Sequence, residues 1–229
     1  MKHGKKYLEV KKLVTANKVY PIAEAIGLAK KTAYTKFDPS IELAIKLNVD
    51  TTKPEQQLRG AVALPHYFGK TQRILVLSDD ITTAQAKEVG IDYLGGKDRI
   101  DEIKGGWLDF DLIITSPKYM PELSKLGKVL GPKGLMPNPK LGTVTPDVLK
   151  AAIEFKKGKV NYRTDTYGNI HVVIGKASAA VEKIDANIKF FLNFIAAKRP
   201  STVKGEFIQK AYICCSMGPS IKIQFNNLG

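Results

Sequence analysis

The sequence predicts an α+β two-layer domain built from both ends of the chain, with a three-layer, Rossmann-like α/β domain inserted between them. Three observations support this prediction. The two ends combine strand patterns of period two with amphipathic helical segments. The middle alternates short apolar runs with helical segments, which is typical of a parallel sheet covered by helices. The positive charge is concentrated in the two ends.

In the first third of the chain, Ile22–Thr35 has apolar residues at helical spacing and predicts a helix. Between Ile41 and Val49 every second residue is apolar, which predicts a strand with one buried face. After a polar stretch, the segment Leu58–Leu64 is expected to pair back with this strand.

The last third predicts two hairpins and a helix. The paired strands are Val160–Asp165 with Ile170–Ile174, and Phe207–Cys215 with Ile221–Phe225. Both connections contain a glycine, a common hairpin signal. Between the hairpins, Ala180–Ala197 has the apolar spacing of a helix.

The middle third predicts two buried strands, Arg73–Ser78 and Asp111–Thr115. The expected helices lie near Thr83–Val89, Asp98–Lys104, Pro121–Val129 and Pro146–Lys157. We therefore place the discontinuous domain at residues 1–67 and 158–229 and the inserted domain at 68–157. The crossings near His66–Gly69 and Gly158–Lys159 are hinge candidates, because two connections join the domains.

The charge indicates the class of partner. The chain has 229 residues and a net charge of +14, from 36 basic and 22 acidic residues. Residues 1–67 carry 12 basic and 6 acidic residues, and residues 158–229 carry 10 and 4. Such an excess attracts a polyanion, and nucleic acid is favoured over an anionic membrane because no basic amphipathic helix with a bulky apolar face stands out.

Other classes of protein find little support. No apolar run reaches the roughly 18 residues of a membrane helix, and no secretory signal is evident at the start. The histidines are His3, His66 and His171, none at metal-ligand spacing, and the phosphate-loop and catalytic motifs of common enzymes are missing. Adjacent Cys214 and Cys215 are expected to be reduced. We expect no enzyme activity, cofactor, metal or small-molecule substrate.

A loop in the middle domain is a possible secondary RNA contact. Residues 125–143 are rich in glycine and proline and carry Lys128, Lys133 and Lys140. Outward backbone amides in such a loop can hold an anion, and residues 131–134 match the G-x-x-G clamp of KH domains. The alternative is a rigid loop that ends a helix, with solvated lysines.

The turn Ser216–Ser220 is a second candidate. Its small residues expose the backbone to a sugar–phosphate strand, the hydroxyls and the Gly218 amide can bond 2′-hydroxyls, and Met217 can pack over a ribose or base. The alternative is an ordinary hairpin turn.

Basic residues near the first strand form a third candidate. Lys36 and Phe37 offer a charge for phosphate beside a ring for a base, unless Phe37 is part of the core. Lys46 and Arg59 are expected to project together from the polar face of one sheet, on neighbouring strands. Arg163 and His171 are expected to join them; the alternative is a solvated face.

These segments together resemble a family, the bacterial-type large-subunit ribosomal protein L-one, along nearly the whole chain. The stretch from Ser124 to Thr145 is the most specific. The matching stretches are KHGKKY, KFDPSIELAIKLNVD, LRGAVALPHYFGK, DYLGG, WLDFD, SKLGKVLGPKGLMPNPKLGTVT, GNIHVVIGKAS and SMGPS.

The resemblance implies a two-domain ribosomal protein whose end-built domain is the main RNA-binding part. It implies binding to a junction of large-subunit ribosomal RNA at a mobile stalk beside the exit-site tRNA, with stalk movement linked to release of deacylated tRNA. It also implies repression of its own operon mRNA through a similar RNA shape. The chain would be a cytoplasmic component of the large ribosomal subunit, from a bacterium or encoded in an organelle, and a monomer when free.

Carried over by position, the resemblance implies a set of RNA-facing residues from both ends of the chain. They are Lys36, Phe37, Ser40, Glu42, Lys46, Arg59, Arg163, Asp165, His171, Lys176, Ser178, Ser216, Met217 and Gly218. Glu42 and Asp165 would accept bonds from 2′-hydroxyls or orient Arg59 or Arg163. The chain departs from the family at Cys214 and Cys215, where threonines are usual, so contacts by those hydroxyls are in doubt.

Two rival functions remain open. One is a free RNA-binding repressor that acts mainly on mRNA through the same surface. The other is a nucleotide-using enzyme built on the middle domain, against which the missing phosphate loop argues.

Overall fold

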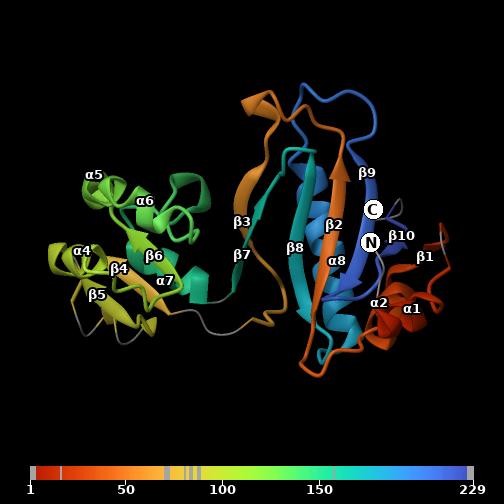
Figure 1. The fold of residues 1–229 in the computed structure, drawn as a ribbon. Helices are drawn as coiled ribbons and strands as arrows, with labels where there is room; N and C mark the ends of the chain where they lie inside the picture. The colour runs from red at the N-terminus through yellow and green to blue at the C-terminus, as the bar shows by residue number, and fades with distance from the viewer. Residues whose placement is uncertain are drawn as a thin grey trace. The chain divides into compact units, whose positions relative to one another are not determined.

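The chain divides into two compact units in the computed structural model, which describes residues 4–15, 17–69, 73–79, 81–82, 85–86, 89–156 and 158–225. The first unit comprises Met1–Gly69 and Val160–Gly229, and the second comprises Lys70–Lys159 (Figure 1). Composition places the inserted segment at 68–157, whereas the contacts within each unit place it at 70–159.

The first unit contains a five-stranded sheet, a two-stranded sheet and several helices. Its elements are α1 (Lys5–Lys11), β1 (Val19–Tyr20), α2 (Ile22–Lys31), β2 (Ser40–Leu47), η1 (Pro54–Gln56), β3 (Arg59–Ala63), β7 (Lys159–Arg163), β8 (Asn169–Lys176), α8 (Val181–Ala197), β9 (Ile208–Cys215) and β10 (Ile221–Ile223). The large sheet has the order β1-β10-β9-β2-β8, and β3 pairs with β7 in the small sheet. Helices α2 and α8 lie side by side on one face of the large sheet.

The central strand β2 follows from its period-two pattern. Ile41, Leu43, Ile45 and Leu47 are buried against the helices, and the residues between them are only half-buried. The partner surface comes from α8, where Ile184, Ile188 and others recur at helical spacing. Truncating one of these side chains to alanine lowers the free energy of unfolding by roughly 2–5 kcal/mol, because the cavity does not refill.

The strand and both helices that the sequence predicts for this unit are confirmed by β2, α2 and α8, although α2 ends at Lys31.

The expected pairing of Leu58–Leu64 with β2 is wrong. Strands β8 and β9 form antiparallel ladders on the two edges of β2 and leave no edge for a third partner. Thr164 instead connects the start of β3 to the end of β7: its hydroxyl accepts a hydrogen bond from the Leu58 amide at 3.0 Å, and its own amide donates to the Leu58 carbonyl at 2.9 Å.

The two predicted hairpins differ in extent. Strands β9 and β10 pair antiparallel as expected. Strands β7 and β8 meet only near their connection, through a bridge between Thr164 and Ile170 and a bond from the Asp165 amide to the Asn169 carbonyl. Beyond that point β7 leaves β8 and pairs with β3.

The second unit is a three-stranded parallel sheet with helices on both faces. Its elements are β4 (Ile74–Leu77), β5 (Tyr93–Gly95), α4 (Lys97–Lys104), β6 (Leu112–Thr115), η2 (Pro117–Tyr119), α5 (Met120–Lys125), α6 (Gly127–Leu130), η3 (Pro139–Leu141) and α7 (Val148–Lys156). The strand order is β5-β4-β6. All of β4 is buried: Leu75 and Leu77 face the core beside α4 and α5, whereas Ile74 and Val76 face the core beside α7.

Three details differ from the sequence prediction. Strand β5 has no recognisable pattern of its own in the sequence, being only three residues long. The helix expected over Pro121–Val129 is broken at Leu126, which has non-helical dihedral angles, into α5 and α6. Of the helix expected at Thr83–Val89, only Gln85, Ala86 and Val89 belong to the described residues. The Rossmann-like character of this unit stays a prediction.

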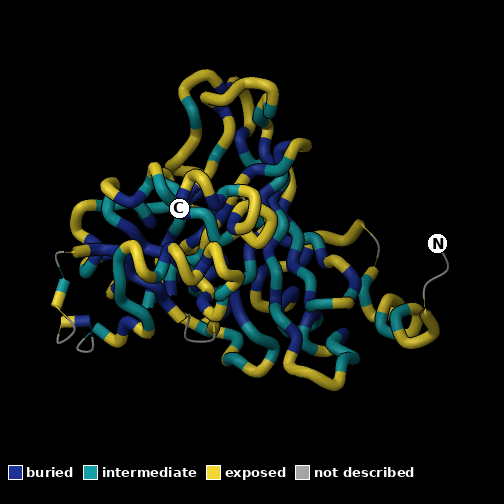
Figure 2. Tube along the Cα trace, turned by 60° about the vertical axis from the view of Figure 1, so that its left-hand side comes forward, coloured by how far each residue is buried: buried dark blue, intermediate teal, exposed yellow. Residues whose placement is uncertain are grey.

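Buried and exposed segments alternate along the chain as this layering requires. The buried parts of the trace lie mainly in the strands and on the sheet-facing sides of the helices, whereas the connecting loops are mainly exposed (Figure 2). Helix α1, beside the label N in Figure 2, contains no buried residue. Among the helices that the structure describes, none is long and apolar enough to cross a membrane.

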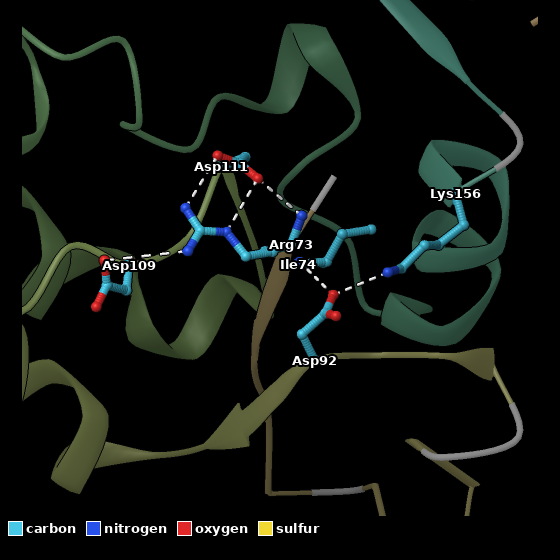
Figure 3. Close-up of polar contacts among 6 residues, drawn as sticks. All are labelled: Arg73, Ile74, Asp92, Asp109, Asp111 and Lys156. Carbon is cyan, nitrogen blue, oxygen red and sulfur yellow. Dashed lines mark hydrogen bonds and ion pairs between the residues drawn. The ribbon is translucent and has the colours of Figure 1, made fainter. Parts of the chain in front are cut away.

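Two acidic side chains accept hydrogen bonds from main-chain amides at the amino end of the parallel sheet (Figure 3). The Arg73 and Ile74 amides, at the start of β4, donate to Asp111 and Asp92 at 2.9 Å each. Lys156, at the end of α7, donates to the same Asp92 oxygen at 2.8 Å. Partial burial raises the pKa of Asp92, but the bonds from Lys156 and the Ile74 amide lower it more, so the net pKa lies below its usual value.

We expect Asp92→Asn to lower the free energy of unfolding of the second unit by about 1 kcal/mol at pH 7, because a charge-assisted contact is lost at a partly exposed site. The native pKa is depressed, so this contribution is present above the unfolded-state pKa of about 4 and is lost as the pH falls through the native pKa. Trp107 is the only tryptophan, and its fluorescence in urea reports this unit.

The matched control is Asp109→Asn, because Asp109 is 75% exposed and lies 4.0 Å from Arg73. It should leave the unfolding curve unchanged. Equal stability of Asp92→Asn and the wild type at pH 7 would contradict the role of Asp92.

Candidate nucleic-acid interface

The large sheet presents a polar face on the side opposite α2 and α8, here called the outer face. Directly paired residues share a face of a sheet. The half-buried residues of β2 therefore lie beside partners from β8, β9 and β10. The polar residues of the outer face are Ser40, Glu42, Lys46, Asn169, His171, Lys176, Lys210, Tyr212, Cys214 and Lys222. Lysines outnumber acids on this face.

The turn between β9 and β10 is held by its main chain and leaves its side chain free to contact a ligand. Met217 has a positive φ of 68°, its carbonyl accepts a hydrogen bond from the Tyr34 hydroxyl at 3.0 Å, and the Gly218 amide donates to the Cys215 carbonyl at 2.8 Å. The Met217 side chain is 69% exposed. An exposed apolar side chain on a fixed backbone is suited to packing against a ribose or a base.

This turn is joined to the start of β2. The Ser216 amide donates to the Ser40 carbonyl at 2.9 Å, and the Ser40 amide donates to the Ser216 hydroxyl at 3.3 Å. Lys176, at the end of β8, donates to the Ser40 hydroxyl at 2.9 Å. Three of the predicted residues, from distant parts of the chain, therefore lie in contact.

The segment before β2 packs beside the segment after β8. Asp38 accepts two hydrogen bonds from Ser178, one from its amide at 3.1 Å and one from its hydroxyl at 2.8 Å. Phe37 is 59% exposed, so the alternative that it belongs to the core is wrong. Lys36 is also exposed. We call this group the tip cluster. Ser40, Lys176, Ser178, Ser216, Met217 and Gly218 belong to it through these contacts, and Lys36 and Phe37 belong to it because they directly precede Asp38 in the chain.

A second group lies at the other end of β2, around the turn between β7 and β8. Lys46 donates to the Tyr167 carbonyl, and the Leu47 amide donates to the Gly168 carbonyl at 2.9 Å. Asp165 accepts bonds from the Tyr167 and Asn169 amides at 2.8 and 2.7 Å. His171 lies 3.8 Å from the same carboxylate. Lys46, Asp165 and His171, together with Arg163, form the hairpin cluster.

The role of Asp165 is therefore largely structural. Burial raises its pKa, but the hydrogen bonds from Asn169 and Tyr167 lower it more, so the net pKa lies below its usual value. Its contacts among the described residues are with the turn and His171 rather than with Arg59 or Arg163. Asp165 fixes the turn that positions Lys46.

The expectation that Arg59 and Lys46 project from one sheet is wrong, because β3 belongs to the small sheet. The same holds for Arg163 on β7 and His171 on β8. Arg163 nevertheless adjoins Asp165, since both line an open recess of about 410 Å³ with Thr51 and Gln57. The contacts of the described residues do not bring Arg59 to either cluster.

The two clusters mark the ends of one strand. Ser40 begins β2 and Lys46 lies near its end, which at about 3.4 Å per residue separates the clusters by roughly 20 Å. Glu42 lies between them on the outer face, opposite Cys214. No acidic partner for Arg163 or Lys36 is found among the described residues.

Sequence reasoning missed four exposed or half-buried residues on this side of the sheet: Lys210, Tyr212 and Lys222 on the outer face, and Tyr167 at the turn, which is 77% exposed. The signal was present, because Lys210, Tyr212 and Cys214 alternate with buried residues along β9. Asp38 was also missed; its position before β2 carries no pattern that reveals its partner.

The cysteines have separate environments. Cys215 points into the core and is buried, whereas Cys214 lies on the outer face. Burial raises the pKa of the Cys215 thiol to about 11. Burial, with a smaller effect of Glu42, also raises the pKa of Cys214. Of the two, only Cys214 lies on the face where a hydroxyl could meet RNA.

The glycine-rich loop of the second unit uses its amides internally. Gly131 donates to the Gly127 carbonyl at 2.9 Å, Gly134 to Gly131 at 3.0 Å and Leu135 to Leu130 at 3.0 Å. These amides are therefore not directed at an anion. Lys128, Lys133 and Lys140 are exposed, so their role as a secondary RNA contact stays a prediction.

Within the described residues, no group of three or more histidine, cysteine, aspartate or glutamate side chains could hold a metal ion. His3 and the first residues of the KHGKKY stretch lie outside the described part.

Comparisons with known proteins agree on one family. A family model described as the ribosomal protein L1p/L10e family matches residues 29–219. A protein of Malacoplasma penetrans named large ribosomal subunit protein uL1 is 58% identical over 209 residues, which cover 91% of this chain and 62% of that protein, so the chain spans less than two thirds of that relative. A protein of the same name from Ureaplasma parvum is 54% identical over 99% of this chain and 99% of its own length. Another from Mycoplasma genitalium is 54% identical over 97% of this chain and 98% of its own length.

We expect Gly168→Ala to destabilise the first unit more than Gly205→Ala does. Both glycines have a positive φ, of 78° and 75°, which costs about 1–2 kcal/mol with a side chain. At Gly168 an added Cβ would also meet the Leu47 carbonyl and Val49 at 3.2 Å, whereas at Gly205 nothing lies within 4 Å. Urea unfolding followed by far-UV circular dichroism measures the difference; equal costs would contradict the close packing of this turn on β2.

We expect Cys215 to resist alkylation by iodoacetamide at pH 8 in a Cys214→Ser variant. With a pKa of about 11 its thiolate fraction is about 100-fold below that of an unfolded cysteine, and the side chain is buried. Mass spectrometry measures the labelling rate in buffer and in urea. Similar rates in the two conditions would show that Cys215 is accessible in the native protein.

Proposed function

Because the chain belongs to the ribosomal protein L1p/L10e family, we propose that it is a component of the bacterial large ribosomal subunit that binds ribosomal RNA through its first unit. The observation that carries this proposal is that strands from the first third and the last third of the chain form one sheet. Segments 36–46, 163–178 and 216–218 are far apart in the sequence and form two clusters along β2.

The proposed mechanism is recognition of RNA shape without chemistry. Lysines and arginines of the two clusters neutralise phosphates and release counterions. The hydroxyls of Ser40, Ser178 and Ser216 and the main chain of the tip are suited to hydrogen bonds with 2′-hydroxyls. A separation of roughly 20 Å lets the two clusters contact separate backbone segments of a folded RNA and so favours a junction over a single strand.

The finer role rests on the family resemblance. We propose that the RNA is the junction at the mobile stalk near the exit-site tRNA, that the protein assists release of deacylated tRNA, and that it represses its own operon mRNA through the same surface. Lys128, Lys133 and Lys140 are the proposed secondary contact. Co-sedimentation with large subunits in moderate salt separates the ribosomal role from that of a free repressor, which would stay in the supernatant.

A nucleotide-using enzyme is the weaker alternative. Titration calorimetry with ATP or GTP tests it directly, and measurable binding to the second unit would favour it.

We expect Met217→Asp to weaken binding of large-subunit ribosomal RNA by about 30-fold, which corresponds to about 2 kcal/mol for a charge placed against RNA without a partner. The fold should be unaffected, because the side chain is 69% exposed. Filter binding measures the affinity and circular dichroism the fold.

The matched control is Ile153→Asp, on α7 of the second unit, where the side chain is 37% exposed. It introduces the same charge and should bind RNA as the wild type does. Wild-type affinity of Met217→Asp would remove the tip from the proposed interface.

A further inference from the structure

A basic cleft lies in the first unit beside the tip cluster, and its lining residues belong to neither the tip cluster nor the hairpin cluster. It has a volume of about 530 Å³, within the usual range for small-ligand sites. We call it the α1 cleft. Its walls come from α1 and the segment after it, from β9 and β10, and from the turn between those strands. The lining residues that matter are Tyr7, Lys11, Lys18, Lys210, Tyr212 and Lys222.

The lining carries charge of one sign. Four lysines and no aspartate or glutamate line the cleft. Lys18 has an acidic neighbour outside it, Glu24, at 3.7 Å. Within the described part of the chain, Lys11, Lys210 and Lys222 have no acidic side chain at ion-pair distance. Several ammonium groups around one hollow repel one another, and a bound anion relieves that repulsion.

Two aromatic rings in the cleft, those of Tyr7 and Tyr212, favour a nucleotide over a free phosphate as the ligand. Tyr212 projects from β9, paired with Lys222 on β10, and Tyr7 projects from α1. A free phosphate needs only the lysines. Lysines interleaved with aromatic rings are the combination that binds a phosphate together with an unstacked base. Ser220 adds a hydroxyl at the rim.

The position of the cleft connects it to the proposed RNA path. Pro219 and Ser220 line it and directly follow Gly218 of the tip cluster. On the outer face, Lys210 lies opposite Lys46. An RNA strand that contacts Met217 therefore lies beside the rim of the cleft.

We propose that the α1 cleft binds one unpaired nucleotide of the RNA held by the tip cluster, with its phosphate between Lys210 and Lys222 and its base against Tyr212. The inference rests on the proposed RNA-binding function and deepens it. The nucleotide is unpaired because a base within an A-form duplex cannot present its face to a side chain. Helix α1 supplies Lys11 and Tyr7 as the opposite wall.

The first test compares two double variants of the full chain by filter binding. The probe is the ribosomal RNA fragment that wild-type protein protects from nuclease. Lys210→Ala with Lys222→Ala should weaken binding at least about tenfold and reduce the salt slope by about two. The control combines Lys183→Ala on α8 with Lys198→Ala directly after α8. It removes the same charge on the other side of the sheet and should change affinity less than about threefold. Equal effects of the two double variants would overturn the proposal.

The second test addresses the ring. Tyr212→Phe should bind as the wild type does, whereas Tyr212→Leu, which retains a strand-compatible side chain, should lose about 5- to 100-fold. Ultraviolet cross-linking with mass spectrometry should join Tyr212 or Tyr7 to one nucleotide that chemical probing shows to be unpaired. Cross-links confined to the tip, or to paired nucleotides, would overturn the proposal.

These outcomes separate the inference from the proposed function. If the wild type does not bind the RNA, the proposed function fails, and if Met217→Asp binds normally, the tip cluster is removed from the proposed interface. If Met217→Asp is weakened but the Lys210 and Lys222 double variant matches its control, only the cleft inference fails.

Discussion

The pairing of β2 with β8 and β9 is the constraint on which the first unit depends. One strand from the first third of the chain lies between two strands from the last third, hydrogen-bonded to both along nearly its whole length. Its period of two then assigns each side chain: Ile41, Leu43, Ile45 and Leu47 face the helices, and the residues between them face outward. A slip of one residue would bury charges, so the register is fixed by the hydrophobic effect.

The proposed interface follows from that register. The start of β2 meets the turn after β9 and the end of β8, which assembles the tip cluster. The end of β2 meets the turn before β8, which assembles the hairpin cluster. Acidic residues have a positioning role in both places: Asp38 holds Ser178, and Asp165 holds the turn that accepts the bond from Lys46. A basic surface therefore contains carboxylates whose hydrogen bonds are with the protein itself.

Sequence patterns predicted the elements better than their partners. The strand Ser40–Leu47 and the helices α2 and α8 were evident because each buries one face, which imposes a period on the sequence. The pairing of β3 was mispredicted because a chain segment that can form a strand does not specify which edge it joins, and Thr164 decides that edge through bonds to Leu58. Strand β5 was missed because a strand of three residues has no measurable period.

The sequence by itself determined the layered α and β elements, the excess of positive charge at both ends and the family, because these depend on composition, periodicity and local motifs. The tertiary structure alone decided which residues share a face. It separated Arg59 from Lys46, turned Cys215 inward and Cys214 outward, and gathered Lys11, Lys210 and Lys222 around one cleft. The physical reason is that these juxtapositions arise from contacts between residues up to about 200 positions apart, and no local pattern in the sequence encodes the choice of such a partner.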